Sequence, residues 1–425
     1  MNRDIRKSHA RWVLILVGLL FCSISHATWA AETITDHRVE VKIDERINIV
    51  PPNYSVQATL GLVRHPDGTI FLNTQRHGLY KSVDKGRTWT PSPVTFSDSR
   101  LANQRFHGLG VSSDGKLWLL HQFQGYELNI SNSADGGLTW ITVPVDYANL
   151  APGAPQHPYG SADQIYNTFA EGPDGAMMVS VELRYSIRLA RQFQMADQSI
   201  PGMHSTMIRT TDGGKTWGDP ASVHQYVAET SLAADPNDAN HILVFGRKLR
   251  GLLPGEDEDA AAKRACIPER KRAIYGYTSK TLYKNGLLME STDGGRSFSE
   301  VEGGMIGFYQ IRGTLLWTQG NVIVATHQDG WTDDGHTPVS VGLAKISLDG
   351  GNTWVNGSES GAPFFNQAKT FELVSETPGK GYSSMKPTVE LSPNHFLTAY
   401  TEGDRTSSRV SVKGVLWHIE KTKTD

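Results

Sequence analysis

The sequence predicts an all-β fold, a six-bladed β-propeller built from four-stranded antiparallel blades. Three observations predict it. An eight-residue turn motif occurs five times, strand pairs joined by Asp-Gly turns precede these motifs, and glycine is abundant, with 42 residues. Repeats spaced by several tens of residues are typical of propellers and solenoids, and closely spaced turn signals between alternating apolar residues are typical of antiparallel sheets.

The repeated motif, which we call the Asp box, has the pattern Ser/Thr-x-Asp-x-Gly-x-Thr/Ser-Trp/Phe. Its five copies are Ser82–Trp89, Ser133–Trp140, Thr210–Trp217, Ser291–Phe298 and Ser347–Trp354. Their aspartates, at 84, 135, 212, 293 and 349, are separated by 51, 77, 81 and 56 residues. A pattern of this length does not recur five times by chance, so each box marks one structural unit.

Each position of the box has a mechanical interpretation. The Asp side chain can accept hydrogen bonds from backbone N–H groups of a tight turn. Glycine at the fifth position tolerates a positive φ, and the aromatic residue can pack under the neighbouring sheet. We therefore expect these aspartates to be turn-forming residues and not metal ligands or catalytic acids.

Ahead of the boxes lie hairpins, such as Leu60–Val63 and Ile70–Asn73 around His65-Pro-Asp-Gly68. Two hairpins per unit make one four-stranded blade. The units cover approximately residues 50–95, 100–145, 160–222, 226–302, 305–358 and 380–422. The sixth unit has no box, and we expect the strand near Val39–Ile43 to pair with it and close the ring, which removes an exposed edge.

The first 30 residues are predicted to be a secretory signal peptide. A basic start is followed by the apolar run Trp12–Ser25 and by small residues up to Ala30. An uncleaved anchor is the alternative. Residues 31–425 then form a single propeller, with insertions near 184–204 and 247–280. The second insertion contains Cys266 and a possible short helix at Glu256–Arg272, and such long loops are either functional or solvated surface.

Charge and composition limit the classes of partner and cofactor that we expect for this protein. Cleavage removes four basic residues and one acid, so the net charge of −3 becomes −6, which favours neither nucleic acid nor an anionic membrane as partner. The single remaining cysteine cannot form an internal disulfide. The histidines lack metal-ligand spacing, and we predict no cofactor and no stable membrane insertion. The predicted location is the periplasm or the exterior, and the oligomeric state is not predicted.

The chain resembles the sialidase (neuraminidase) superfamily, whose members carry Asp boxes on six-bladed propellers. Gly381-Tyr382-Ser383-Ser384 resembles the family motif that opens the last blade with the nucleophilic tyrosine. Glu229-Thr-Ser-Leu232 stands where the family has the glutamate paired with that tyrosine, and Arg247 stands where it has one of three arginines that clamp the substrate carboxylate. The resemblance thus implies a tyrosine nucleophile, Tyr382, activated by Glu229. A neutral nucleophile suits an anomeric carbon that carries a carboxylate, because a carboxylate nucleophile would be repelled.

The resemblance also has gaps. Tyr54–Ala58 contains no arginine where the family has its first clamp residue, and Val339–Lys345 contains none where it has the third. Arg76 matches a further family arginine, but the loop that carries the acid/base aspartate has no room after it. Other polar residues of the second and third blades could reach the axis: Arg105, His107, Glu127, Glu182, Arg184 and Asp197. Trp331 could stack on a sugar.

Three functions follow from these residues. The favoured one is a retaining, sialidase-like glycoside hydrolase acting on an acidic sugar, with Tyr382 and Glu229 as catalytic residues and Arg247, Arg76, Arg105 and Arg184 as substrate-binding residues. The second is a non-catalytic propeller that binds a glycan or a protein. The third is a uronate polysaccharide lyase, for which His107 or His157 would be the important residue.

Overall fold

The computed structural model describes residues 37–54, 60–74, 78–98, 100–101, 106–121, 128–145, 168–184, 203–253, 255–265, 283–331, 338–356, 359–375, 385–403 and 410–423. Residues 35–425 form one compact unit. The predicted signal peptide therefore lies outside the described residues. Among the helices of the described ranges, none is long and apolar enough to cross a membrane.

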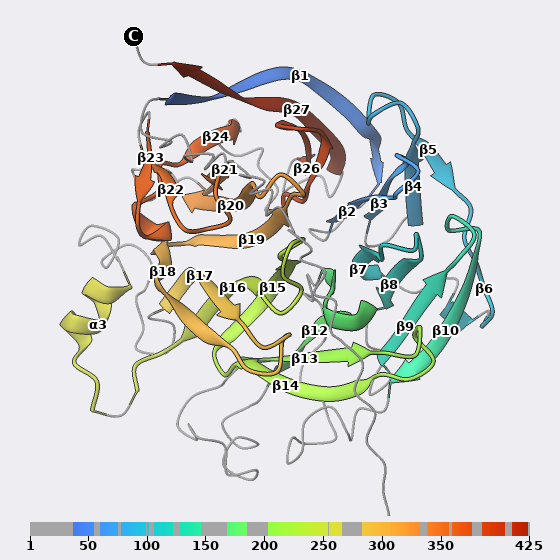
Figure 1. The fold of residues 1–425 in the computed structure, drawn as a ribbon, viewed down its shortest axis with the longest axis horizontal. Coiled ribbons are helices and arrows are strands. Elements are labelled where there is room, and N and C mark those ends of the chain that lie inside the picture. The colour runs from blue at the N-terminus through green and yellow to red at the C-terminus, as the bar shows by residue number, and fades with distance from the viewer. Residues whose placement is uncertain are drawn as a thin grey trace, which may run out of the picture. The chain divides into compact units, whose positions relative to one another are not determined.

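Six antiparallel sheets of four main strands surround a central axis (Figure 1), which confirms the predicted six-bladed propeller. The first blade comprises β2 (Leu60–Arg64), β3 (Ile70–Thr74), β4 (Gly78–Ser82) and β5 (Thr90–Ser92). The second blade comprises β7 (Phe106–Val111), β8 (Leu117–His121), β9 (Leu128–Ser133) and β10 (Thr139–Val145). The third blade comprises β11 (Phe169–Glu171), β12 (Met177–Arg184), β13 (Met203–Thr210) and β14 (Gly218–His224). A short strand, β6 (Thr95–Phe96), pairs in parallel with β10 and makes the second sheet five-stranded.

The fourth and fifth blades are larger. The fourth blade comprises β15 (Val227–Ala234), β16 (Ile242–Arg250), β17 (Tyr283–Ser291) and β18 (Ser299–Phe308). The fifth blade comprises β19 (Gln310–Trp317), β20 (Ile323–Trp331), β21 (Pro338–Ser347) and β24 (Phe371–Val374). In the fifth blade the outer strand is not the segment that follows the box. That segment, β22 (Trp354–Asn356), pairs with β23 (Glu359–Ala362) as a separate hairpin, so this blade extends beyond the predicted 305–358.

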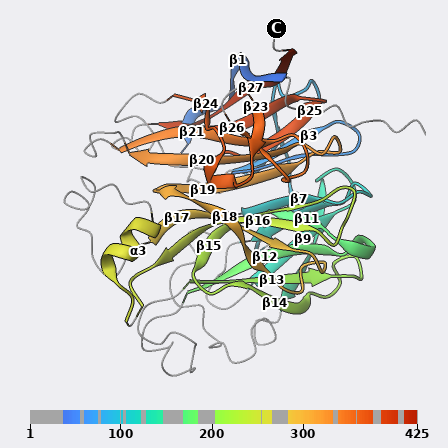
Figure 2. The same ribbon diagram turned by 60° about the vertical axis from the view of Figure 1, so that its left-hand side comes forward.

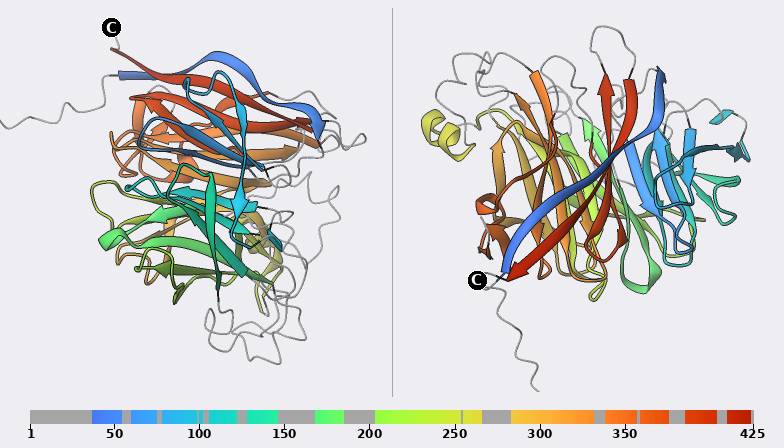
Figure 3. Two further views of the ribbon diagram at one scale, coloured as in Figure 1. Left: turned by 90° about the vertical axis from the view of Figure 1, so that its right-hand side faces the viewer. Right: turned by 90° about the horizontal axis from the view of Figure 1, so that it is seen from above.

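The sixth blade joins the two ends of the compact unit. It contains β25 (Thr388–Ser392), β26 (His395–Gly403), β27 (Val410–Lys423) and, as its outermost strand, β1 (His37–Tyr54). The predicted closing strand is confirmed, and it is much longer than Val39–Ile43. Figure 3 shows the N-terminal strand lying along the C-terminal one, in a register that runs from His37 opposite Lys423 to Tyr54 opposite Val410. The first blade therefore starts at β2 and not near residue 50.

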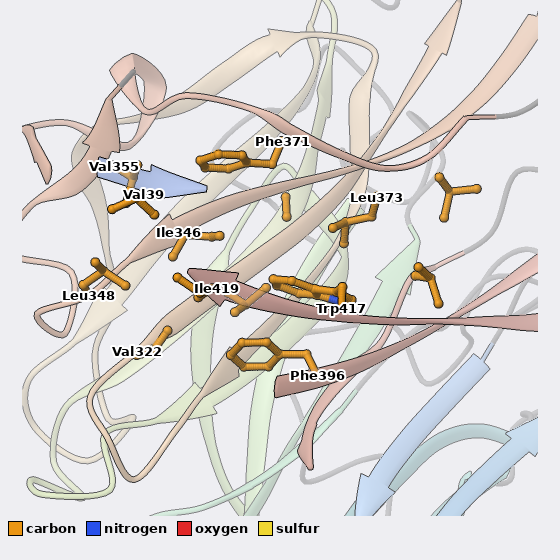
Figure 4. Packing of buried hydrophobic residues seen from close by; sticks show 14 of the residues in the cluster. Val39, Val322, Ile346, Leu348, Val355, Phe371, Leu373, Phe396, Trp417 and Ile419 are labelled. Atoms are coloured by element: carbon orange, nitrogen blue, oxygen red, sulfur yellow. The ribbon is translucent and has the colours of Figure 1, made fainter. Parts of the chain in front are cut away.

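The closing strand is held by apolar packing as well as by backbone pairing. Val39 is buried in one cluster with Phe396 and Trp417, whose rings stack with centroids 4.5 Å apart (Figure 4). Trp417 also donates its indole N–H to Thr398 Oγ1 at 2.9 Å, so the ring is buried without an unpaired donor. This cluster ties the N-terminal strand to the fifth and sixth blades.

Strand direction defines two faces of the propeller. The innermost strands β2, β7, β11, β15, β19 and β25 contact one another in sequence around the axis. The last residues of β2, β7, β15 and β19, together with all of β11 and the first three residues of β25, surround one cavity of about 820 Å³. Each box begins at this same end, as the register of Arg64 with Ile70 and of Ile70 with Ser82 shows. We call this the box face, and we call the opposite face, where the innermost strands begin, the start face.

The boxes form the turns that their sequence predicts. In every copy the first hydroxyl donates to the aspartate and accepts from the N–H of the fifth-position glycine. Those glycines have φ values between 79° and 91°. The hydrogen bond from the Thr139 hydroxyl is the main cause that lowers the pKa of Asp135 to about 2. Two box tryptophans, Trp89 and Trp140, also donate back to the fifth-position carbonyl.

A substitution in the second box tests the turn-forming role. Asp135→Ala removes the acceptor for the backbone N–H groups of Leu138 and Thr139, and we expect it to lower the free energy of unfolding by about 1–3 kcal/mol. Asp135→Asn keeps one acceptor oxygen and should lose less. Urea unfolding measures both, and any catalytic activity should stay unchanged. A loss of activity without a loss of stability would contradict the structural role.

The insertion of the fourth blade contains the helix α3 (Glu258–Arg264), close to the predicted Glu256–Arg272. It lies at the edge of the propeller (Figure 2), with Ala261 and Ala262 packed against Tyr283 and Phe308. Asp257 caps the helix through the N–H of Ala260. Two short 3₁₀ turns lie between strands: η3 (Pro173–Gly175) in the third blade and η4 (Phe365–Gln367) in the fifth.

Candidate active site

The start face carries the residues that the sequence singled out in the fourth blade. Glu229 lies near the beginning of β15, the innermost strand, and Arg247 lies near the end of β16, the next strand outward. Their side chains meet in an ion pair, with Arg247 Nη1 3.0 Å from Glu229 Oε1. Glu229 is fully buried and Arg247 is 7% exposed. A buried carboxylate requires such a partner, so the two residues form one charged unit.

A β-bulge places Glu229 in this position. Ala228 pairs with Arg247 and Ser231 pairs with Phe245, so Glu229 and Thr230 together oppose Gly246. Glu229 has a φ of 52°, which lies in the left-handed region that costs a non-glycine residue of the order of 1–2 kcal/mol. Strained residues of this kind cluster at functional sites.

Neighbouring blades hold the bulge in place. Thr230 shares a hydrogen bond with Ser180 of β12, and Ser231 Oγ accepts the backbone N–H of Leu315 of β19 at 3.0 Å. Opposite the bulge, a Cβ added to Gly246 would lie 2.3 Å from Val227 Cγ1. Any side chain at position 246 would therefore crowd the bulge.

The segment that leads from Tyr382 into the sixth blade is also anchored at this face. The carbonyl of Lys386 accepts hydrogen bonds from Thr314 Oγ1 at 3.0 Å and from Thr326 Oγ1 at 2.7 Å. Met385 and Lys386 are both 1% exposed. The chain three residues after Tyr382 is thus fixed against the fifth blade, next to the fourth blade that carries Glu229.

Several predicted site residues lie outside the described residues: Tyr382, Arg76, Arg105, Glu127, His157 and Asp197. Arg184 ends β12, where its backbone pairs with Met203, Glu182 lies in the same strand, and Trp331 ends β20. His107 is buried at the beginning of β7. Of the six predicted catalytic and substrate-binding residues, the structure therefore brings together Glu229 and Arg247.

Buried polar residues that the sequence analysis did not single out lie at the same face. In the first, second and fifth blades, one residue of the second strand pairs with the first residue of the box. Four residues further along that strand lie Thr74, His121 and His327, which therefore occupy equivalent positions. Within the described part of the chain, Thr74 Oγ1, His121 Nδ1 and both ring nitrogens of His327 have no hydrogen-bond partner. The register set by the boxes was the signal that could have identified them. In the fourth blade this position is Gly246, followed by Arg247.

Burial keeps the two histidines neutral. Burial, together with the nearby charges of Lys345 and Lys386, lowers the pKa of His327 to about 3. Burial and His107 lower the pKa of His121 to about 3, and His121 Nε2 lies 2.6 Å from Ser131 Oγ. Charged imidazoles are therefore disfavoured at this face at neutral pH.

This neutrality predicts a pH-dependent stability. Because the folded-state pKa of His327 lies below that of an unfolded histidine, about 6.5, the unfolded state binds more protons between pH 6.5 and 3. Stability is then full above pH 6.5 and falls with decreasing pH, by up to about 1.4 kcal/mol per pH unit for each histidine. Denaturant titrations at pH 7 and pH 5 should show a smaller difference for His327→Met than for the parent. An equal difference would contradict a neutral His327.

Comparison with known proteins supports the fold. No family model matches the chain, and no curated protein matches it. Among solved structures, the chain is similar to a protein of unknown function from Dyadobacter fermentans, with a TM-score of 0.59 and 16% identity over 89% of this chain and 99% of that one. It is also similar to the Hadza microbial sialidase Hz136, with a TM-score of 0.51 and 14% identity over 87% of this chain and 66% of that one.

A third similar structure is the α-L-arabinofuranosidase Arb93A from Fusarium graminearum in complex with an iminosugar inhibitor. The TM-score is 0.52, with 11% identity over 88% of this chain and 98% of that one. At these identities the likeness concerns architecture. The fold is a sialidase-like six-bladed propeller, as the sequence resemblance predicted.

Proposed function

We propose that this protein is an exported glycoside hydrolase that cleaves an acidic sugar with retention of configuration, using Tyr382 as nucleophile and Glu229 as its base. The observation that carries the proposal is the buried ion pair of Glu229 and Arg247 on a strained bulge at the start face. Tyr382, which the sequence motif places just before the anchored segment at Met385, would approach this pair from the sixth blade.

The proposed chemistry has two steps. Glu229 takes the proton of the Tyr382 hydroxyl as its oxygen attacks the anomeric carbon, and the bond to the leaving-group oxygen breaks as that oxygen gains a proton from an acid. Water then attacks the same carbon and gives a proton to the conjugate base of that acid, while the bond to Tyr382 breaks and the phenolate takes its proton back from Glu229. Two displacements at one carbon retain the configuration.

Arg247 has two tasks in this proposal. One Nη nitrogen neutralises Glu229, and the remaining donors of the guanidinium can hold the carboxylate of the sugar, for which its planar fork is well suited. Arg76, Arg105 and Arg184 are the further proposed substrate-binding residues. Residues 1–30 are the proposed signal peptide that directs the protein out of the cytoplasm.

Hydrolysis of fluorogenic glycosides tests the proposal. Residues 31–425 are incubated with the 4-methylumbelliferyl glycosides of neuraminic, glucuronic and galacturonic acids and with the neutral arabinofuranoside. We expect turnover of an acidic glycoside that Tyr382→Phe abolishes. Tyr80→Phe, which changes a tyrosine packed in the core of the first blade, should retain it. Turnover of no acidic glycoside would overturn the proposal.

A further inference from the structure

The fifth blade repeats the bulge that carries Glu229, with an arginine in its place. On β19, Ile311 pairs with Gln328 and Thr314 pairs with Thr326, so Arg312 and Gly313 together oppose His327. On β15, Ala228 and Ser231 enclose Glu229 and Thr230 in the same way. Arg312 has a φ of 59° and Glu229 a φ of 52°. Arg312 is therefore the counterpart of Glu229 in the next blade.

A hydrogen bond between the innermost strands β15 and β19 places the two bulges at one level. The N–H of Leu315 donates to Ser231 Oγ at 3.0 Å. Both strands run from the start face to the box face. Gly313 lies two residues before Leu315 and Glu229 lies two residues before Ser231, so Gly313 and Glu229 lie at the same level. Arg312 is one residue closer to the start face than Gly313.

The other side of Arg312 faces the sixth blade. Thr314, two residues after Arg312, donates to the carbonyl of Lys386 at 3.0 Å. Lys386 follows Tyr382 by four residues along the chain. In the ring of innermost strands, Arg312 thus lies between the strand that carries the proposed base and the strand that follows the proposed nucleophile.

The position of Arg312 is fixed by packing and remains accessible. A Cβ added to Gly313 would lie 2.0 Å from Phe245 Cδ1, so Phe245 of the fourth blade packs directly on the bulge. Phe245 precedes Arg247 by two residues, which brings the two arginine-bearing segments together. Arg312 is partly exposed, whereas Glu229 is fully buried. Arg312 is therefore open in part to a ligand at the start face.

The fifth blade has no other suitable cation in the stretch where the sequence resemblance predicts one. Val339–Lys345 contains a lysine but no arginine. Lys345 is 3% exposed, and its Nζ donates to the carbonyl of Ala368 at 2.6 Å, close to the ring of Phe365. Its ammonium is thus committed to packing inside the blade.

We infer that Arg312 binds the carboxylate of the acidic sugar and supplies, with Arg247, the second guanidinium of the clamp. This inference rests on the proposed function for the choice of ligand. Two guanidinium groups from adjacent blades can contact both oxygens of one carboxylate, and arginine does so through charge-assisted, often bidentate, hydrogen bonds. The strained backbone at Arg312 is then explained in the same way as the strain at Glu229.

The test separates recognition of the carboxylate from catalysis. Arg312→Met and Arg312→Lys are compared with the parent for hydrolysis of the acidic 4-methylumbelliferyl glycosides and of their methyl esters. Binding of free N-acetylneuraminate and glucuronate, with their methyl esters, is measured by calorimetry. Arg64→Met is the matched control, because Arg64 lies at the axial cavity on the box face.

We expect Arg312→Met to raise KM or Kd for the acid about 100-fold and for the ester less than about threefold. Arg312→Lys should recover part of the affinity for the acid, and Arg64→Met should change neither constant. An unchanged preference for acid over ester in an active Arg312→Met would overturn the inference and leave the proposed function intact. Acid binding that depends on Arg312 without any hydrolysis would support the inference and overturn the proposed function. Absence of acid binding and hydrolysis in the parent would overturn both.

Discussion

Glu229→Gln is expected to lower kcat for an acidic glycoside by about 1000-fold, because the amide cannot take the proton of the Tyr382 hydroxyl. The substitution preserves the shape of the side chain but leaves Arg247 without its carboxylate partner. Breaking a buried pair destabilises a protein by about 3–5 kcal/mol, so the free energy of unfolding is measured alongside kcat. Glu229→Asp keeps the charge and should recover part of both losses.

Glu300 provides the matched control for this experiment. It lies in the same blade, on β18, and its Oε1 contacts Lys248 Nζ at 2.5 Å and His224 Nε2 at 3.0 Å. Those hydrogen bonds, that from His224 foremost, lower the pKa of Glu300 to about 2. Glu300→Gln removes an ion-paired glutamate outside the proposed site and should leave kcat unchanged. A folded Glu229→Gln variant within tenfold of the parent would contradict the role of Glu229 as base.

Removal of the closing strand is predicted to cause a large loss of stability. A chain that begins at residue 56 lacks β1, and with it the buried side chains of Val39, Ile47, Ile49 and Val50. Burial of one such side chain contributes about 1.5–3 kcal/mol, so their sum approaches the total stability of about 5–15 kcal/mol expected of a folded protein. The truncated chain also exposes β27 as a free edge. We expect it to aggregate or to lack a cooperative thermal transition.

A circular permutant distinguishes loss of the strand from loss of the chain connection. His37 pairs with Lys423, so a two-residue Asn-Gly turn can join Lys423 to His37 and append residues 37–54 after β27 as a hairpin. This permutant starts at residue 56, like the truncated chain, and should show a cooperative thermal transition. A truncated chain that unfolds at the parent temperature would show that the ring closes without β1.

Local turn chemistry made the blades predictable. Each Asp box contains its own hydrogen-bond acceptor and its own glycine, so its conformation depends little on the rest of the chain, and the five copies fixed the register of the blades. Pairing at the sheet edges is less local. The strand after the fifth box, Trp354–Asn356, turns back on β23, and η4 packs Phe365 against Trp354 with ring centroids 4.7 Å apart. No alternation pattern identifies which later segment becomes the outer strand.

The site was predictable in part. A family motif pointed to Glu229 and Arg247, and they meet in an ion pair. The bulge was not predictable, because a glutamate or an arginine at positive φ contradicts local preference, and the conformation is imposed by Ser180, Leu315 and Phe245 from neighbouring strands. Arg312 was missed for this reason. The signal in the sequence was Gly313, which follows Arg312. Phe245 of the fourth blade occupies the space that a Cβ at position 313 would need.

Trapping of the covalent intermediate tests whether Tyr382 is the nucleophile. An acidic fluorosugar with a good leaving group, which forms the glycosyl–enzyme rapidly and releases it slowly, is incubated with residues 31–425, and the protein is digested and analysed by mass spectrometry. We expect one added sugar on the peptide that contains Tyr382, and no label in Tyr382→Phe. A label on Glu229, or turnover with inverted configuration and no label, would contradict it.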